Sequence, residues 1–202
     1  MKVLIATTNQ GKIDIYGSVL HKLGLDYCSL KDLNISLGVE ETGKTEAENA
    51  LIKARAYNKL TGMPVVSNDS GLVIDKLKPE DQPGVFVRRN HGKELTDEEL
   101  LNFYIEKIKE VGGQSSGHFN VALAIIDENG NEFVREFKPQ RLFVSTPNKI
   151  IKKGIPLDSI AFDLTTGKYM SEMTTAERNM CEGEELLKQQ NFIKEIFSRN
   201  RK

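Results

Sequence analysis

The first third of the chain alternates short apolar runs with amphipathic helical patterns, and this alternation constrains the fold more than any other feature. An apolar run over residues 2–6 leads through the polar segment Thr7–Lys12 into a helix with apolar residues at helical spacing, which Gly24 ends. A second helix over 45–61 opens with a capping box, and a buried strand over 64–67 follows it. Strands that alternate with helices predict an α/β fold.

The pattern becomes mainly β after a third capped helix, which opens at Thr96. Strands are predicted at His118–Ile126 and Glu132–Phe137 around a hairpin turn, and a further strand at Arg141–Ser145. An amphipathic helix over Asn191–Phe197 closes the chain. The whole predicts an α/β fold with a long, mixed central sheet.

Composition narrows the functional classes. The 202 residues carry 28 Lys+Arg and 29 Asp+Glu, a net charge of −1, so no global basic field attracts nucleic acid or an anionic membrane. No repeat or linker divides the chain, and we expect one domain over 1–202. Cys28 and Cys181 form no CxxC pair, which argues against a zinc site or disulfide framework and favours the cytoplasm. The N-terminal apolar run is too short for a signal peptide or a membrane span.

Two segments have the residue types of a metal-triphosphate site. Thr7–Lys12 joins a strand to a helix N-terminus, where free backbone N–H groups and the helix dipole favour an anion. Glu40 and Glu41 precede Lys53, and Asn68–Ser70 follows the buried strand, so that carboxylates can hold Mg²⁺ at a strand end. Each segment also has a purely structural explanation. The asparagine of the first segment can cap the helix, the glutamates can complement the dipole of the next helix, and the aspartate can lie in a turn.

Taken in chain order, the segments ATTNQGK, EETGKTEAENALIKA, NDSGLVID and PGVFVRR resemble the inosine triphosphate pyrophosphatase family. The segment SEMTTAERN, over 171–179, continues the resemblance towards the C-terminus. Members of this family hydrolyse deaminated purine nucleoside triphosphates to the monophosphate and pyrophosphate. The resemblance implies an elongated mixed sheet flanked by helices, two lobes with a nucleotide cleft between them, a Mg²⁺ requirement and a homodimer.

The resemblance also implies roles for individual residues of this chain. Glu41 and Asp69 correspond to metal ligands, and Asp69 also to the base for the attacking water. The phosphate-binding positions are Thr8, Asn9, Lys12, Lys53, Ser70, Arg178 and one of the pair Arg88 and Arg89, of which we select Arg89. A Mg²⁺ ion bridging phosphate oxygens offsets their charge and lowers the pKa of a bound water, so the chemistry agrees with these residue types.

The departures from the family lie at its base-binding end. Phe162 and Asp163 occupy the place of the family's aromatic residue and aspartate, and Leu164 replaces the following proline. Glu182-Gly183-Glu184 stands where family members have the Ser-His-Arg that reads a 6-oxo group, and Asn68 replaces an acid. We therefore assign base contacts to Phe162, Asp163 and Glu184 and expect an altered base preference. The alternative is that these glutamates are the exposed start of the last helix.

The sequence thus predicts a Mg²⁺-dependent enzyme that hydrolyses a nucleoside triphosphate to the monophosphate and pyrophosphate. Its substrate is the expected partner, together with a second copy of the chain. A catalytically weak nucleotide-binding regulator with the same fold is the alternative, and an interaction protein is a third hypothesis. A regulator has no need of a water-activating carboxylate, so Glu41, Lys53 and Asp69 favour the enzyme.

Overall fold

A computed structural model describes residues 1–202 except 91–92, 175, 179–182 and 200–202, and leaves the side chains of 89, 90 and 199 undescribed. The main sheet is mixed and eight-stranded, in the order β10-β9-β8-β6-β3-β1-β2, with β7 paired to β6. Its strands are β1 (Lys2–Ile5), β2 (Asp26–Ser29), β3 (Val65–Ile74), β6 (Gln114–Ile126), β7 (Glu132–Phe137), β8 (Gln140–Val144), β9 (Ala161–Asp163) and β10 (Lys168–Tyr169). The described part of the chain therefore confirms the predicted mixed α/β class.

The strand directions follow from the connections between them. β1 pairs in parallel with β2 and with β3; α1 connects β1 to β2, and α2 connects β2 to β3. The β6–β7, β6–β8, β8–β9 and β9–β10 pairs are antiparallel. The remaining elements are α1 (Gln10–Lys22), α2 (Glu46–Thr61), α3 (Asp97–Glu110), α5 (Gly183–Arg199), the 3₁₀ turns at Pro79–Asp81 and Pro156–Ser159, and the short antiparallel pair β4 (Arg89–Asn90) and β5 (Lys93–Glu94).

The chain divides into two compact units. The first contains Met1–Ser70, Val121–Phe137 and Leu187–Lys202, and the second contains Gly71–Asn120 and Lys138–Leu186. Boundaries fall within β3, within β6, between β7 and β8, and within α5, so β3, β6 and α5 each contribute residues to both units. The expectations of one domain over 1–202, of an elongated shape and of a cleft between two lobes stay predictions.

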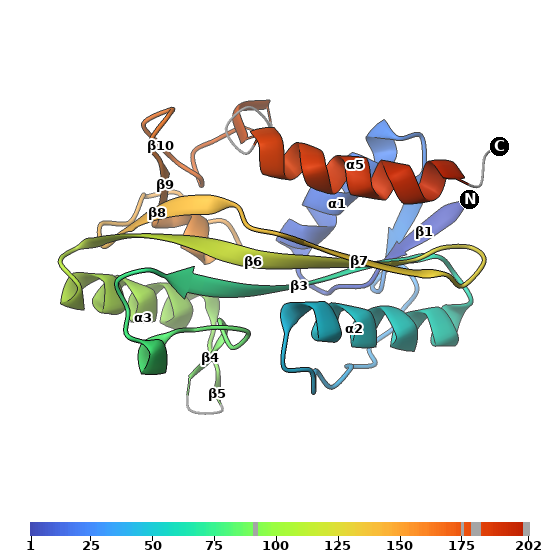
Figure 1. Ribbon diagram of the computed structural model, residues 1–202, viewed down its shortest axis with the longest axis horizontal. Coiled ribbons are helices and arrows are strands. Elements are labelled where there is room, and N and C mark those ends of the chain that lie inside the picture. The colour runs from blue at the N-terminus through green and yellow to red at the C-terminus, as the bar shows by residue number, and fades with distance from the viewer. Residues whose placement is uncertain (91–92, 175, 179–182, 200–202) are drawn as a thin grey trace. The chain divides into compact units, whose positions relative to one another are not determined.

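In the first unit, helices cover both faces of the strands (Figure 1). α1 and α5 lie on one face, where Tyr16 and Leu20 pack with Phe192 and Ile196 in one buried cluster. α2 lies on the other face, and its small residues Ala50 and Ala54 are completely buried beside the strands. Small side chains on this face of α2 let the helix approach the sheet closely.

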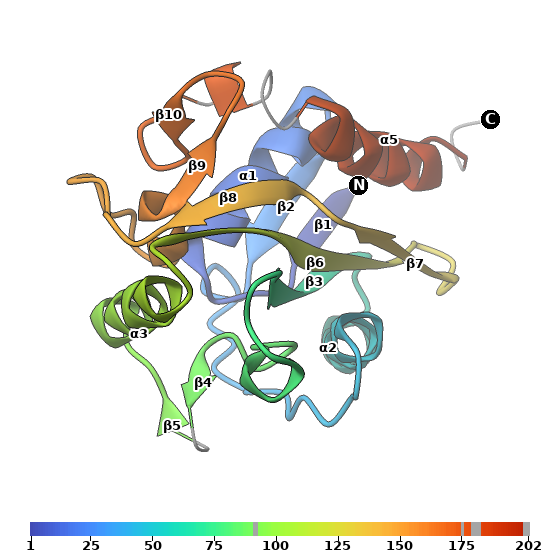
Figure 2. The ribbon, with the colours of Figure 1, turned by 60° about the vertical axis from the view of Figure 1, so that its left-hand side comes forward.

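In the second unit, α3 supplies much of the core (Figure 2). Leu100, Tyr104 and Ile108 of this helix pack in a cluster with Phe143 of β8. The predicted capping box is present in full, since Thr96 Oγ1 accepts from the Glu99 N–H and Glu99 Oε2 accepts from the Thr96 N–H, at 3.2 and 2.9 Å. A fixed N-terminus sets where the apolar face of α3 begins.

Several predicted boundaries need correction. The strand expected over 64–67 is the ten-residue β3, so Asp69 lies inside a strand and not in a turn after it. The box expected at Thr45 is only half formed, because Glu48 Oε2 accepts from the Lys44 N–H. The last helix begins at Gly183, earlier than the predicted start.

The alternation of side chains along β3 decides how the site is arranged. Val65 belongs to the cluster under α2, whereas Val66 belongs to the cluster under α1 and α5. Successive side chains of a strand point to opposite faces, so Asp69 faces α2 and Ser70 faces α1. The register between β1 and β3 runs from Leu4–Val65 to Ile5–Val66, where β1 ends. The polar residues of β3 therefore lie beyond the end of β1.

Among the described helices, none combines the length and the apolar character that crossing a membrane requires.

Candidate functional site

Three predicted residues meet on the α2 side of β3. Lys53 Nζ lies 2.9 Å from Glu41 Oε1 and 3.2 Å from Asp69 Oδ1, so one ammonium group bridges two carboxylates. The side chains of Lys53 and Asp69 are only 13% and 10% exposed, which makes their interaction stronger than that of a surface pair. The structure therefore brings Glu41, Lys53 and Asp69 together, and their roles in binding metal and phosphate stay predictions.

Glu41 is the more open of the two carboxylates, with its side chain 31% exposed. The pKa of the Tyr57 hydroxyl is raised, mainly by burial and to a lesser extent by the negative charge of Glu41. The Tyr57 hydroxyl donates to the Leu37 carbonyl oxygen at 2.8 Å. Tyr57 thus ties the segment before Glu41 to α2.

A fourth residue in this cluster, Asn49, was not identified from the sequence. Its side chain is buried, with 3% exposed, and its Nδ2 donates to Asp69 Oδ2 at 3.3 Å. Its Oδ1 accepts from the Gly43 N–H at 2.8 Å. A polar residue at a buried position of an otherwise apolar helix face was the available signal, since buried amides require partners.

A second pair of predicted residues meets on the α1 side of β3. Lys12 Nζ donates to Ser70 Oγ at 3.2 Å. Asn9 is the N-cap of α1, and its Oδ1 accepts from the Lys12 N–H at 3.2 Å. Thr8 is exposed in the turn between β1 and α1. The helix-cap explanation of Asn9 is therefore correct, and the turn still presents the positive end of α1 beside Lys12.

The donor atoms around Asp69 suit a hard divalent cation. Glu41 and Asp69 offer carboxylate oxygens on the α2 side of β3. Mg²⁺ prefers oxygen ligands and is commonly held by one or two carboxylates together with substrate phosphates. Within the described part of the chain no group of three or more metal-binding side chains occurs.

The predicted base-contacting residues lie in the second unit and have partners there. Phe162 is half-buried in β9, and its ring packs edge-to-face on Tyr169 with centroids 5.2 Å apart. Asp163 Oδ2 accepts from the backbone N–H and the hydroxyl of Thr166, both at 2.7 Å. Asp163 therefore stabilises the turn between β9 and β10, and Phe162 packs on Tyr169.

The predicted basic residues of the second unit are also engaged. Arg178 donates to Asp158 and to the Met170 carbonyl oxygen, with its side chain 15% exposed. Nearby Lys152 has its pKa lowered by burial and, in addition, by the charge of Arg178. Arg88 pairs with Asp97 at 2.8 Å and donates to the Gly154 carbonyl oxygen at 2.9 Å. The side chain of the selected residue, Arg89, lies outside the described residues.

Glu184 lies in the first turn of α5 and is exposed. An acidic residue there complements the helix dipole, which is the alternative explanation that the sequence left open. The neighbouring Glu185 accepts from the Lys138 N–H at 3.0 Å and belongs to the same acidic turn. Glu182 and Cys181 lie outside the described residues.

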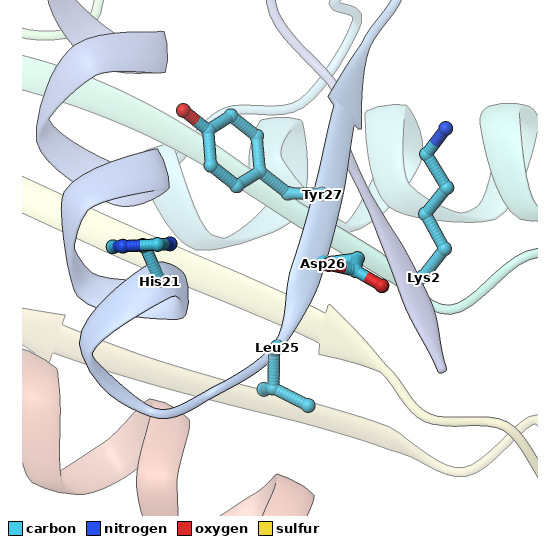
Figure 3. A pocket seen from close by; sticks show the side chains of 5 residues that line it. All are labelled: Lys2, His21, Leu25, Asp26 and Tyr27. Carbon is cyan, nitrogen blue, oxygen red and sulfur yellow. The ribbon is translucent and has the colours of Figure 1, made fainter.

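A surface hollow of about 320 Å³ lies away from these residues, at the other end of β1 (Figure 3). It is lined by Lys2, His21, Leu25, Asp26 and Tyr27. The Tyr27 ring points towards α1, and a Cβ on Gly17 of that helix would lie 2.5 Å from it. None of the predicted site residues lines the hollow.

Comparison with known proteins identifies relatives over most of the chain. Residues 3–183 match the model of the Ham1 family. A dITP/XTP pyrophosphatase of Shigella flexneri is 33% identical over 184 residues, covering 88% of this chain and 89% of that protein. Another from Leptospira interrogans is 39% identical over 129 residues, covering 63% and 64%.

Solved structures of similar proteins have the same fold. A HAM1 protein from Coxiella burnetii has a TM-score of 0.73 at 27% identity, covering 96% of this chain and 99% of that one. A nucleoside-triphosphatase or dITP/XTP pyrophosphatase from Mycobacterium abscessus has a TM-score of 0.64 at 28% identity, covering 92% and 95%. The resemblance inferred from the sequence motifs is confirmed, and the chain belongs to the Ham1 family of these dITP/XTP pyrophosphatases.

Proposed function

We propose that the chain hydrolyses a nucleoside triphosphate to the nucleoside monophosphate and pyrophosphate with the help of Mg²⁺. The observation that carries this proposal is the buried Asp69, whose two oxygens are held by Lys53 and Asn49 beside Glu41. Membership of the Ham1 family supports the same activity. The whole of 1–202 would act as one enzymatic domain, in the cytoplasm and as a homodimer.

The triphosphate would lie where β3 extends beyond β1, between the two lysines. Lys12 and Ser70 meet on one face of β3, and Lys53 lies on the other. The N-terminal turn of α1, with Thr8 and Asn9, adds backbone donors and the positive dipole end. Arg89 and Arg178 would add charge from the second unit, which for Arg178 requires release from Asp158. Fixed cations suit phosphoryl transfer because positioning and charge stabilisation supply most of its catalysis.

Glu41 and Asp69 are the residues that would hold Mg²⁺. When bound, the ion offsets phosphate charge and lowers the pKa of a bound water. Lys53 pairs with both carboxylates, so triphosphate binding would draw Lys53 towards phosphate oxygens and free carboxylate oxygens for the metal. This exchange couples substrate binding to metal binding.

Asp69 would then accept the proton of the attacking water. The oxygen of that water forms a bond to the α-phosphorus, the bond from the α-phosphorus to the bridging oxygen breaks, and pyrophosphate leaves. Lys53 holds Asp69 Oδ1, so this oxygen would become available to the water once Lys53 moves to the phosphates. Asn49 would keep the other oxygen, Oδ2, in place. General-base catalysis of this kind contributes about 10²–10⁴-fold in rate.

We also propose that the base preference differs from that of relatives named for dITP and XTP. An acidic side chain beside a 6-oxo group sets two acceptors against each other, at about 1–3 kcal/mol. Glu184 would pair instead with an exocyclic amino group, as carboxylates do with the amine of cytosine, and Phe162 would stack on the base. The acidic first turn of α5 supports this proposal only if Glu184 turns towards the base.

A substrate panel tests the base preference. The values of kcat/KM are measured for inosine, xanthosine, adenosine, guanosine and cytidine triphosphates with Mg²⁺, for the parent and for Glu184→Gln. We expect amino-bearing bases to be preferred, and Glu184→Gln to raise the relative kcat/KM for inosine triphosphate. A strong preference of the parent for inosine triphosphate would contradict the altered preference without touching the hydrolysis itself.

A further inference from the structure

Asn49 makes two contacts that link separate parts of the candidate site. Its Nδ2 donates to Asp69 on β3, and its Oδ1 accepts from the backbone of Gly43, two residues after Glu41. Asn49 and Lys53 are four residues apart on α2 and therefore lie on the same face of the helix. Asp69 and the segment that carries Glu41 are therefore each contacted twice from one turn of α2, by the neutral Asn49 and by the charged Lys53.

The two contacts fix the orientation of the amide. A backbone N–H can only donate, so the Gly43 contact requires the Asn49 oxygen, and the NH₂ group is left to face Asp69. The amide is buried, with 3% of Asn49 exposed. A reversed amide would place its NH₂ group against the Gly43 N–H, donor against donor, and its oxygen against the Asp69 carboxylate, acceptor against acceptor. Asp69 Oδ2 therefore meets a donor that does not change its charge.

The Gly43 backbone comes too close to Asn49 to carry a side chain. A Cβ at Gly43 would lie 2.6 Å from Asn49 Oδ1 and 2.7 Å from Glu48 Cβ. The close approach permits the 2.8 Å hydrogen bond between the Gly43 N–H and Asn49. The two residues are thus fitted to each other.

We infer that Asn49 is a positioning residue, which holds the Asp69 carboxylate by Oδ2 and the Glu41 segment by the Gly43 N–H while Lys53 exchanges partners. This inference rests on the proposed function, because it assigns Asn49 a task in the use of Asp69 and Glu41. Lys53 has to leave the carboxylates when phosphates arrive, so a contact that stays in place is needed to keep Asp69 aimed. The Asn49 amide carries no charge and is not drawn to the phosphates.

The test uses two substitutions that separate the contacts, and a control. Asn49→Ala removes both hydrogen bonds. Asn49→Asp keeps the shape and the acceptor for the Gly43 N–H, but replaces the donor facing Asp69. The matched control is Asn58→Ala on the same helix, because the Asn58 side chain donates to the Met63 carbonyl oxygen, at 2.8 Å, beside the C-terminal end of α2.

Two measurements are made on the purified full chain. In the first, kcat and KM for a good substrate triphosphate are determined with Mg²⁺. We expect both Asn49 variants to lower kcat by about 10- to 100-fold, the usual effect of removing a partner of a metal ligand, with KM of Asn49→Ala within about threefold of the parent. In the second, the affinity for Mn²⁺ alone is followed by the electron paramagnetic resonance signal of the free ion. Asn49→Ala should bind about 10- to 100-fold more weakly, and Asn58→Ala should match the parent in both measurements.

Each contrary result has a distinct meaning. Parental kcat in Asn49→Asp, with a loss in Asn49→Ala, would overturn the contact to Asp69, and equal losses in Asn49→Ala and Asn58→Ala would show a merely structural role. If Asp69→Asn is inactive while both Asn49 variants match the parent, this inference fails and the proposed function stands. If Asp69→Asn keeps parental turnover, the proposed function fails, and Mn²⁺ affinity still tests Asn49.

Discussion

At the scale of single residues, the site depends on which oxygen of Asp69 meets which neighbour. Lys53 holds one oxygen at 3.2 Å and Asn49 holds the other at 3.3 Å. Asp69 is 7% exposed, so few waters compete for these contacts. A buried carboxylate with one mobile and one fixed partner is suited to binding a metal and to accepting a proton.

Asp69→Asn should abolish turnover and leave the fold intact. The amide has nearly the same shape, but it is neither an anionic metal ligand nor a proton acceptor, so a loss of about 10²–10⁴-fold or more in kcat is expected. Glu41→Gln should have a milder effect, because Glu41 is the more exposed carboxylate. Turnover is measured together with circular dichroism, and near-parental activity of Asp69→Asn would remove this residue from the mechanism.

Lys12→Ala and Lys53→Ala should each raise KM for the triphosphate and lower kcat. Their charges face phosphate oxygens whose charge changes on the way to the transition state. Lys53→Ala should be the more severe, since it also leaves Glu41 and Asp69 without the ammonium group between them. Steady-state kinetics and titration with triphosphate and monophosphate measure these effects. Parental affinity for triphosphate in both variants would mean that the phosphates bind elsewhere.

At the scale of elements, the ends of α3 and the length of β3 show what local sequence specifies. The α3 capping box was predictable because its contacts lie within four residues. The length of β3 was not, because Asn68-Asp69-Ser70-Gly71 is typical of a turn and becomes strand only through pairing with distant residues. Asn49 was missed for the same reason, since its partners Gly43 and Asp69 are brought to it by the fold.

The α3 cap provides a test of pH dependence. Hydrogen bonds from the Lys93 side chain and from Thr96 lower the pKa of Glu99 from 4.5 to about 2. A pKa depressed in the folded state stabilises the protein above the unfolded value, and this stabilisation is lost as the pH falls towards about 2. The parent should therefore have a higher Tm than Glu99→Gln at pH 7, and the difference should shrink between about pH 4.5 and 2.5. A difference in Tm that stays constant over a thermal-unfolding series would contradict this assignment.

At the scale of the whole molecule, the fold is that of the Ham1 family over nearly the full chain. The contacts among the proposed site residues of the first unit were predictable, because their motifs lie on the first strands and helices. The contacts of the predicted residues in the second unit were less predictable. Asp163, predicted to contact the base, instead accepts from Thr166 three residues on and stabilises its own turn. Arg178, predicted to bind phosphate, pairs with Asp158, a contact between distant residues that no local spacing indicates.

The central claim is that water attacks the α-phosphorus of a nucleoside triphosphate. It is tested most directly by hydrolysis of a good substrate triphosphate in ¹⁸O-enriched water with Mg²⁺, followed by mass spectrometry of the products. Attack at the α-phosphorus predicts one ¹⁸O atom in the nucleoside monophosphate and none in the pyrophosphate. Label in the pyrophosphate, or products that are a nucleoside diphosphate and phosphate, would contradict the account.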